Sequence, residues 1–187
     1  MIILANNPLF NGIAPNVLTE DLREINFHTR IYRKGEILAH QGDVCNRLVI
    51  LIKGSVRGEM IDDSGRLIKV EDIAAPRAIA PLFLFGNENR YPVEVTANEA
   101  TEVIEIPKTS VLKLFRKNEK FLENYMNLSA NYAHTLSDKL FFMSFKTIRQ
   151  KLASYLLRLS NQQQSEHITL NRSQQQLSDY FGVSRPS

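Results

Sequence analysis

The sequence predicts an α+β fold in which an antiparallel β-roll, of the jelly-roll or double-stranded β-helix type, precedes a long helix and a C-terminal helix-turn-helix. Short aliphatic runs separated by glycines extend from about residue 28 to residue 106. Residues 119–146 then form one periodic segment without proline or glycine. The last fourteen residues, 174–187, have the glycine and small-residue spacing of a helix-turn-helix. We therefore expect three parts, residues 1–118, 119–146 and 147–187.

The composition excludes several classes of protein. Hydrophobic residues make up 43% of the 187 residues and charged residues 23%, a balance typical of globular rather than disordered chains. Because Cys45 is the only cysteine, no disulfide can form within one chain. The apolar start lacks the basic region of a signal peptide, and no run reaches the roughly 18 apolar residues that span a membrane. The sequence thus predicts a cytoplasmic protein with no membrane contact.

The positive charge is concentrated in the last quarter of the chain. The net charge is +3, yet residues 144–187 hold six basic side chains against two acidic ones. This region would therefore bind a polyanion such as nucleic acid. A solvated basic surface would show the same balance.

Residues 13–25 and 108–117 have the apolar spacing of short amphipathic helices, and they flank the strand-rich region. Between them, aspartate and glycine at positions 62–65 predict a hairpin turn, because both residue types tolerate positive φ. Many short strands with such turns indicate an antiparallel sandwich or barrel. The expected strands include Ile31-Tyr32, Ile37-Leu38, residues 48–52, residues 93–95 and residues 103–106.

The helix expected at residues 119–146 has two apolar faces. One is a heptad seam, in which apolar or small side chains recur in alternating steps of four and three. The other stripe includes Phe121, Tyr125 and Tyr132. We infer that this stripe packs on the strand domain and that the seam pairs with a second copy, forming a homodimer; a helix buried in one core is the alternative. The seam consists of Leu122, Met126, Ser129, Ala133, Leu136, Leu140 and Met143.

The C-terminal segment has the capping and packing residues of a helix-turn-helix. A helix at residues 148–159 and a short strand at residues 167–170 are expected before it. Ser173 is a favourable N-cap, and Gly182 stands where the first helix must turn, because glycine adopts the left-handed conformation at low cost. Small Ser178 allows the two helices to cross closely.

The second helix of such a motif places its first turn in the major groove of DNA. Arg185 is positioned to bind the O6 and N7 atoms of guanine. Ser184 and Ser187 are suited to phosphates, and Arg172 and Gln174 complete the candidate DNA-binding residues. Because only one turn of this helix is present, we expect it to continue beyond Ser187 in the complete protein. Without that continuation, specific operator binding is not expected.

The order of these parts resembles the Crp–Fnr superfamily of bacterial transcription regulators over nearly the whole chain. Residues 33–43 (RKGEILAHQGD) are similar to the glycine-acid signature of the family's β-roll, and residues 48–57 match the strand and glycine turn that follow. Residues 177–185 match the LA-x-x-x-G-x-S-R motif, with Ser178 in place of alanine. The resemblance implies a cyclic-nucleotide-binding-like sensor domain, a dimerisation helix and a winged helix-turn-helix. It also implies an effector-responsive, non-enzymatic regulator whose partners are operator DNA, a second copy and RNA polymerase.

The residues that hold the effector in the family's cyclic-nucleotide binders are missing. Those members use a Gly-Glu pair and then an Arg-Ser or Arg-Ala pair, but here the first pair falls on Ala80-Pro81, and Arg90 precedes Tyr91-Pro92 about one residue out of register. The comparison therefore predicts no cyclic AMP site. Cys45 alone excludes the cysteine-bound iron–sulfur cluster of oxygen-sensing members, whereas haem, a small organic ligand or no effector stay open. Candidate haem ligands are His28, His40, His134, Met60 and Met126.

If the β-roll holds an effector, its pocket walls are expected to come from two loops and the long helix. These walls are Ala80, Pro81, Leu82, Phe83, Arg90, Tyr91, Pro92, Tyr125 and Tyr132.

Two alternatives involve no DNA, namely a cupin-like metal-binding protein and a regulatory β-roll subunit. A cupin needs clustered histidines on adjacent strands, but His28 and His40 are isolated, so we predict no metal site. The Arg185 motif disfavours the regulatory subunit.

Overall fold

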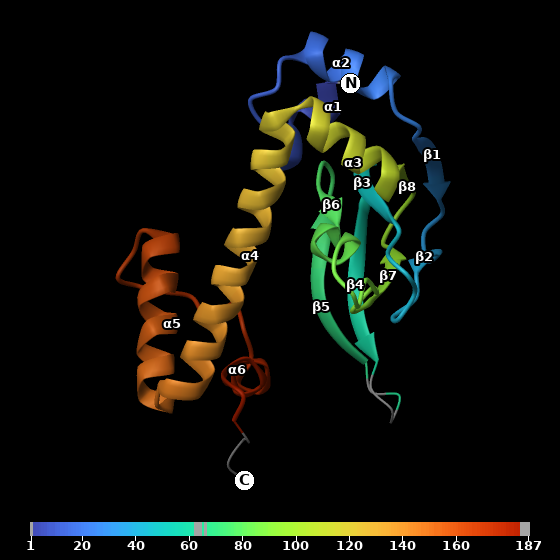
Figure 1. Ribbon diagram of the computed structural model, residues 1–187. Helices are drawn as coiled ribbons and strands as arrows, with labels where there is room; N and C mark the ends of the chain where they lie inside the picture. The colour runs from blue at the N-terminus through green and yellow to red at the C-terminus, as the bar shows by residue number, and fades with distance from the viewer. Residues whose placement is uncertain (1, 62–64, 66, 184–187) are drawn as a thin grey trace. The chain divides into compact units, whose positions relative to one another are not determined.

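The computed structural model of the protein describes residues 2–61, 65 and 67–183, apart from the side chains of residues 2, 3 and 179. The chain forms two compact units, Met1–Ser129 and Ala130–Ser187, and helix α4 (Glu119–Phe145) runs from the first into the second (Figure 1). The boundaries predicted from the sequence treat this helix as a part of its own, whereas the two units share it. None of the helices within the described ranges is long and apolar enough to span a bilayer.

The N-terminal unit contains two four-stranded antiparallel sheets, which confirms the predicted antiparallel β-roll. The strand order is β1-β8-β3-β6 in one sheet and β2-β7-β4-β5 in the other. The strands are β1 (His28–Tyr32), β2 (Ile37–Ala39), β3 (Arg47–Lys53), β4 (Ser55–Ile61), β5 (Leu67–Ala74), β6 (Ala78–Ile79), β7 (Glu94–Ala97) and β8 (Thr101–Pro107).

Short helices precede and follow the strands, and the amphipathic helices predicted from the sequence are confirmed. A buried hydrogen bond joins one of them to the start of α4, because the Asn118 amide donates to the Asp21 carboxylate at 2.7 Å. The same Asn118 side chain accepts from the Phe121 N–H at 3.0 Å and so caps α4. These elements are α1 (Ile2–Ala5), η1 (Pro8–Phe10), α2 (Pro15–Arg23), η2 (Pro81–Leu84) and α3 (Lys108–Lys117).

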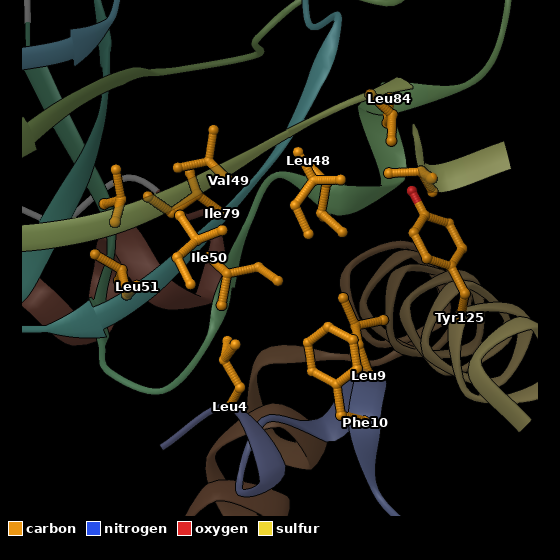
Figure 2. Packing of buried hydrophobic residues seen from close by; sticks show 14 of the residues in the cluster. Leu4, Leu9, Phe10, Leu48, Val49, Ile50, Leu51, Ile79, Leu84 and Tyr125 are labelled. Carbon is orange, nitrogen blue, oxygen red and sulfur yellow. The ribbon is translucent and has the colours of Figure 1, made fainter. Parts of the chain in front are cut away.

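Strand β3 forms the centre of the core, because it lies between β8 and β6 and is buried on both faces. Its residues Leu48–Leu51 are each 5% exposed or less. Figure 2 shows them near Ile79 of β6 and near Leu9 and Phe10 of η1. Phe10 in turn stacks on Phe121 of α4 with ring centroids 5.3 Å apart. The first turns of α4 are therefore part of the β-roll's own core.

The hairpin between β4 and β5 lies where the sequence predicts a turn. The ladder closes with Ile61 opposite Leu67, and Gly65 has a φ of +80°. The other turn residues, 62–64, lie outside the described residues. Strand β5 itself was not predicted, because its first six residues are all exposed and show no alternation of burial.

The C-terminal unit contains the end of α4, α5 (Ile148–Gln163) and α6 (Gln174–Phe181). A reciprocal capping box starts α5, in which the Thr147 N–H donates to the Gln150 side chain at 2.9 Å and the Gln150 N–H donates to the Thr147 hydroxyl at 3.3 Å. The small core of this unit is aromatic. It consists of Tyr155, Leu159 and Phe181, with Phe142, Leu156, Ile168, Leu177 and Tyr180 packed against them.

Two sequence predictions in this unit were wrong. Helix α5 extends to Gln163 instead of ending near residue 159. Residues 167–170 pair with no strand among the described residues, and Ile168 packs on the Tyr155 core instead. An apolar run forms a strand only where a second strand supplies hydrogen-bond partners.

Candidate nucleic-acid interface and effector site

Helix α6 has the capping bonds that the sequence predicts. The Gln176 N–H donates to the Ser173 hydroxyl at 3.2 Å, and the Ser173 N–H donates to the Gln176 side chain at 2.8 Å. At the other end, Gly182 has a φ of +64°, and the Val183 N–H donates to the Ser178 carbonyl oxygen at 3.0 Å. The predicted roles of Ser173 and Gly182 are therefore confirmed. This turn sets the direction in which the chain leaves α6.

Aromatic packing and one buried lysine hold α6 on its neighbours. The Phe181 ring lies 6.3 Å from Phe142 of α4 and 6.0 Å from Tyr155 of α5, between ring centroids. The Lys151 ammonium group of α5 donates to the carbonyl oxygens of Met143 and Phe181, each at 3.0 Å. The helix that precedes the candidate recognition helix is thus fixed to both α4 and α5.

Sequence reasoning missed the role of Lys151 in holding α6 on α4 and α5. One signal was available, since Lys151 stands four residues before Tyr155 and eight before Leu159, on the buried stripe of α5. A cation on an apolar stripe needs buried acceptors. Their identity could not be read from the sequence.

The candidate DNA-binding residues fall into two groups. Arg172 and Gln174 are exposed at the start of α6, and the Arg172 guanidinium lies 4.6 Å from the centroid of the Tyr180 ring. Ser184, Arg185 and Ser187 lie outside the described residues. The DNA contacts assigned to all five stay predictions.

The predicted seam of α4 is largely exposed on the chain. Met126, Leu136 and Leu140 are 61%, 62% and 66% exposed, and Met143 and Ala133 are also exposed. Leu122 and Ser129, nearer the β-roll, are half-buried. The pairing of this face with a second copy stays a prediction.

The second stripe of α4 packs as predicted where it meets the β-roll. Phe121 is fully buried and Tyr125 nearly so, among aromatic rings that include Phe115 at 5.5 and 5.0 Å. Tyr132 belongs to the C-terminal unit and is half-buried. The two tyrosines predicted to line one effector pocket therefore lie in different units.

The loop predicted to hold the first half of an effector pocket is closed by α4. The Tyr125 hydroxyl donates to the carbonyl oxygen of buried Pro81, and in Figure 2 it points toward the segment that carries Leu84. Ala80 has a left-handed φ of 45°. Leu82 is half-buried and Phe83 is 36% exposed. In this loop, buried Pro81 is therefore held against α4, while Leu82 and Phe83 remain partly exposed.

The loop at residues 90–92, predicted to supply the other wall of an effector pocket, is arranged differently. The exposed Arg90 guanidinium donates to the Gly42 carbonyl oxygen at 2.7 Å and so holds a neighbouring turn. Tyr91 is 5% exposed, and burial beside the Cys45 thiol raises the pKa of its hydroxyl. Burial likewise raises the pKa of the Cys45 thiol. Pro92 is half-buried. The buried side chain in this loop is therefore a tyrosine, not an arginine.

In one region between the two sheets, where Tyr91 and Glu105 meet aliphatic residues, the side chains leave no room for a water molecule. The Glu105 carboxylate accepts from the Tyr32 hydroxyl at 3.3 Å and pairs with Arg47 at 3.3 Å. The remaining lining residues of this space are Tyr32, Leu38, Ala39, Val49, Ile79 and Val95.

The candidate haem ligands belong to different elements and to both units. The His40 imidazole lies 3.0 Å from the Glu94 carboxylate, and the His134 imidazole lies 3.0 Å from the Asp138 carboxylate, in the other unit. Met60 and Met126 are exposed on different elements. The part of the chain that the structure describes contains no group of three or more His, Cys, Asp or Glu side chains that could hold a metal ion.

Two family models match separate parts of the chain. A cyclic nucleotide-binding domain matches residues 29–118, and a Crp-like helix-turn-helix domain matches residues 150–187. These two segments correspond to the β-roll and to the α5–α6 segment with the residues that follow it.

Individual proteins are also similar to this chain. The cyclic AMP receptor protein of Thermus thermophilus is 28% identical over 167 residues, covering 85% of this chain and 72% of the relative. A transcriptional regulator of Thermotoga maritima is 31% identical in its solved structure, which covers 69% of this chain and 98% of that chain with a TM-score of 0.64. The catabolite activator protein of Thermus thermophilus, 24% identical, has the same fold with a TM-score of 0.67 over 95% of this chain and 81% of that chain. The chain therefore belongs to the Crp–Fnr family of DNA-binding transcription regulators.

Proposed function

We propose that the protein is a homodimer that binds operator DNA sequence-specifically and responds to an effector other than cyclic AMP. The exposed apolar seam of α4 is the observation that best supports the homodimer. Met126, Leu136 and Leu140 recur on one helix face, yet each is more than 60% exposed. Burial of each such side chain against a second copy would contribute about 1.5–3 kcal/mol.

Small residues near the middle of this seam favour close approach of two helices. Ser129 and Ala133 have short side chains, as a tight helix pair requires. The Ser129 hydroxyl already donates to the Tyr125 carbonyl oxygen at 3.0 Å. Its burial in an interface would therefore leave no unsatisfied polar group.

The DNA contacts are assigned to the residues around α6. Arg172 and Gln174 stand at its start, and Ser184, Arg185 and Ser187 follow its C-terminal turn. A homodimer would present two such helices to two half-sites of an operator. RNA polymerase as a further partner and the cytoplasm as location fit a regulator of this family. The match to a helix-turn-helix does not favour a β-roll or cupin-like protein without DNA binding.

Two features of the described residues support an effector other than a cyclic nucleotide. Pro81 has no backbone N–H, and its carbonyl oxygen is taken by the Tyr125 hydroxyl. Tyr91 stands where the family's phosphate-binding arginine would be, and it is buried between the sheets, in the region with no room for a water molecule. A ligand of this size needs a pocket of roughly 300 Å³ or more. These features argue against cyclic AMP, and haem, a small organic molecule or no effector remain the alternatives from the sequence.

Two measurements on the full-length protein test this proposal. Multi-angle light scattering should give twice the mass of one chain, and a monomer would overturn the dimer. Isothermal titration with cyclic AMP should give no saturable heat up to about 1 mM, a concentration that detects affinities near −4 kcal/mol. Tight, saturable binding of cyclic AMP would overturn the effector assignment.

A further inference from the structure

A cavity of about 560 Å³ lies between α4, α5 and α6, inside the C-terminal unit. Its size is within the range of roughly 300–1,000 Å³ that small-molecule sites have. It leaves space next to the helix that precedes the candidate recognition helix. Its lining residues are Thr135, Asp138, Lys139, Phe142, Met143, Ser154, Tyr155, Arg158 and Tyr180.

Aromatic rings from all three helices line this cavity. Phe142 of α4 lies 6.2 Å from Tyr180 of α6, and Tyr155 of α5 lies 5.9 Å from the same ring, between centroids. Phe142 and Tyr180 remain half-buried, so their surfaces are not fully used by packing within the chain. A planar aromatic group could stack against such rings and gain about 0.5–1.5 kcal/mol per ring pair beyond the area it buries.

The charges at the cavity favour an anion. The Arg158 guanidinium lies 6.0 Å from the Tyr155 ring and 5.7 Å from the Tyr180 ring, and it donates to the Tyr180 hydroxyl at 2.8 Å. Lys139 is a second cation in the lining. The carboxylate in the lining, Asp138, lies 3.0 Å from the His134 imidazole. The lining thus contains two cations and one carboxylate, and that carboxylate lies beside a histidine.

Contacts with DNA phosphates would explain these cations but not the aromatic walls. Phosphate contacts need exposed donors and no enclosed volume. A cavity with tilted aromatic rings and an arginine over two of them instead matches a ligand that has both a flat apolar body and a negative group.

We propose that this cavity binds a small planar aromatic anion, such as an aromatic carboxylate, and that it is an effector site within the DNA-binding unit. The ring of the ligand would lie against Phe142 and Tyr180, with its carboxylate toward Arg158 and Lys139. Such a ligand contacts three helices at once, so its affinity depends on how α6 is placed on α4 and α5. By linkage, it shifts the population of α6 placements toward the one it binds best. Only this regulatory step rests on the proposed DNA-binding function.

The direct test is isothermal titration of the full-length protein with 2-naphthoate. We expect saturable binding of one molecule per subunit, and at least ten-fold weaker binding of the uncharged analogue 2-naphthalenemethanol. Arg158→Gln should weaken 2-naphthoate binding at least ten-fold, while the matched control Arg116→Gln, at an exposed site of α3, should leave it unchanged. Ser154→Phe, which fills the cavity from α5, should abolish binding and serves as the second variant if Arg158→Gln fails to fold. Circular dichroism checks the fold of each variant.

Several results would overturn the proposal. These are no saturable binding of 2-naphthoate, or equal binding by wild type, Arg158→Gln and folded Ser154→Phe. If Arg158→Gln weakens DNA binding but not 2-naphthoate binding, the cations serve DNA phosphates and the cavity is not an effector site. Because titration with 2-naphthoate requires no DNA, a failure of the proposed DNA-binding function would be seen separately, in DNA titrations of the same samples.

Discussion

The Lys151 ammonium group donates a hydrogen bond to the carbonyl oxygen of Phe181 at 3.0 Å, from a position that is 6% exposed. Phe181 is the last residue of α6, and the same ammonium group also donates to Met143 in the last turn of α4. Carbonyl groups at helix C-termini lack partners within the helix and carry partial negative charge. One cation therefore joins the ends of two helices.

Lys151→Met should destabilise the C-terminal unit by about 1–3 kcal/mol, because it leaves two carbonyl oxygens without their charged donor. It should also weaken DNA binding, since α6 loses a fixed contact. Thermal unfolding and DNA titration would measure both effects. Lys113→Met, at an exposed site of α3, is the matched control. Equal stability of the two variants would show that Lys151 contributes nothing.

Leu136→Glu should produce monomers, because it places a charge at the centre of the proposed seam, where burial of an unpaired carboxylate is costly. Light scattering would show half the wild-type mass. Leu157→Glu, on α5 and similarly exposed at 67%, is the control and should keep the dimer mass. A dimeric Leu136→Glu protein would remove this face of α4 from the interface.

Gly182→Ala should destabilise the C-terminal unit by about 1–2 kcal/mol, because the left-handed φ of +64° disfavours alanine. An added Cβ would also come within 3.0 Å of the Met143 side chain. Gly182→Asn should cost less, since asparagine tolerates this conformation. A lower free energy of unfolding for Gly182→Asn than for Gly182→Ala would contradict the assigned turn.

Tyr125→Phe should destabilise the N-terminal unit by about 1–3 kcal/mol, because the buried Pro81 carbonyl oxygen loses its donor. Tyr132→Phe is the control, as the Tyr132 hydroxyl has no hydrogen bond within the described part of the chain. Chemical denaturation of both variants would measure the difference. Equal free energies of unfolding would mean that the Tyr125 bond does not close the roll.

Elements with a regular burial pattern or local capping could be predicted from the sequence. The aliphatic runs of β3 and β8 can be read directly from the sequence, although their pairing is long-range. The caps of α6 depend on neighbours at most a few residues away. Strand β5 could not be predicted, because it exists only through its ladder with β4 and has exposed side chains along most of its length.

In the candidate site, too, roles that depend on near neighbours in the sequence could be predicted, whereas long-range contacts could not. Ser173 and Gly182 act through bonds within one helix, so their roles were predictable. In contrast, Lys151 and Phe181 are 30 residues apart, and Arg90 reaches Gly42 across 48 residues. The sequence placed Arg90 in an effector pocket because nothing local reveals this long-range acceptor.

Specific DNA recognition is the central claim, and fluorescence anisotropy of the full-length protein tests it most directly. The protein is titrated against labelled DNA from its own promoter and against shuffled DNA of the same composition, alongside Arg185→Ala. We expect promoter DNA to bind at least about 10³-fold more tightly than shuffled DNA. Arg185→Ala should lower the specific binding by about 1–3 kcal/mol. Equal affinity of the wild-type protein for the two DNAs would contradict the account.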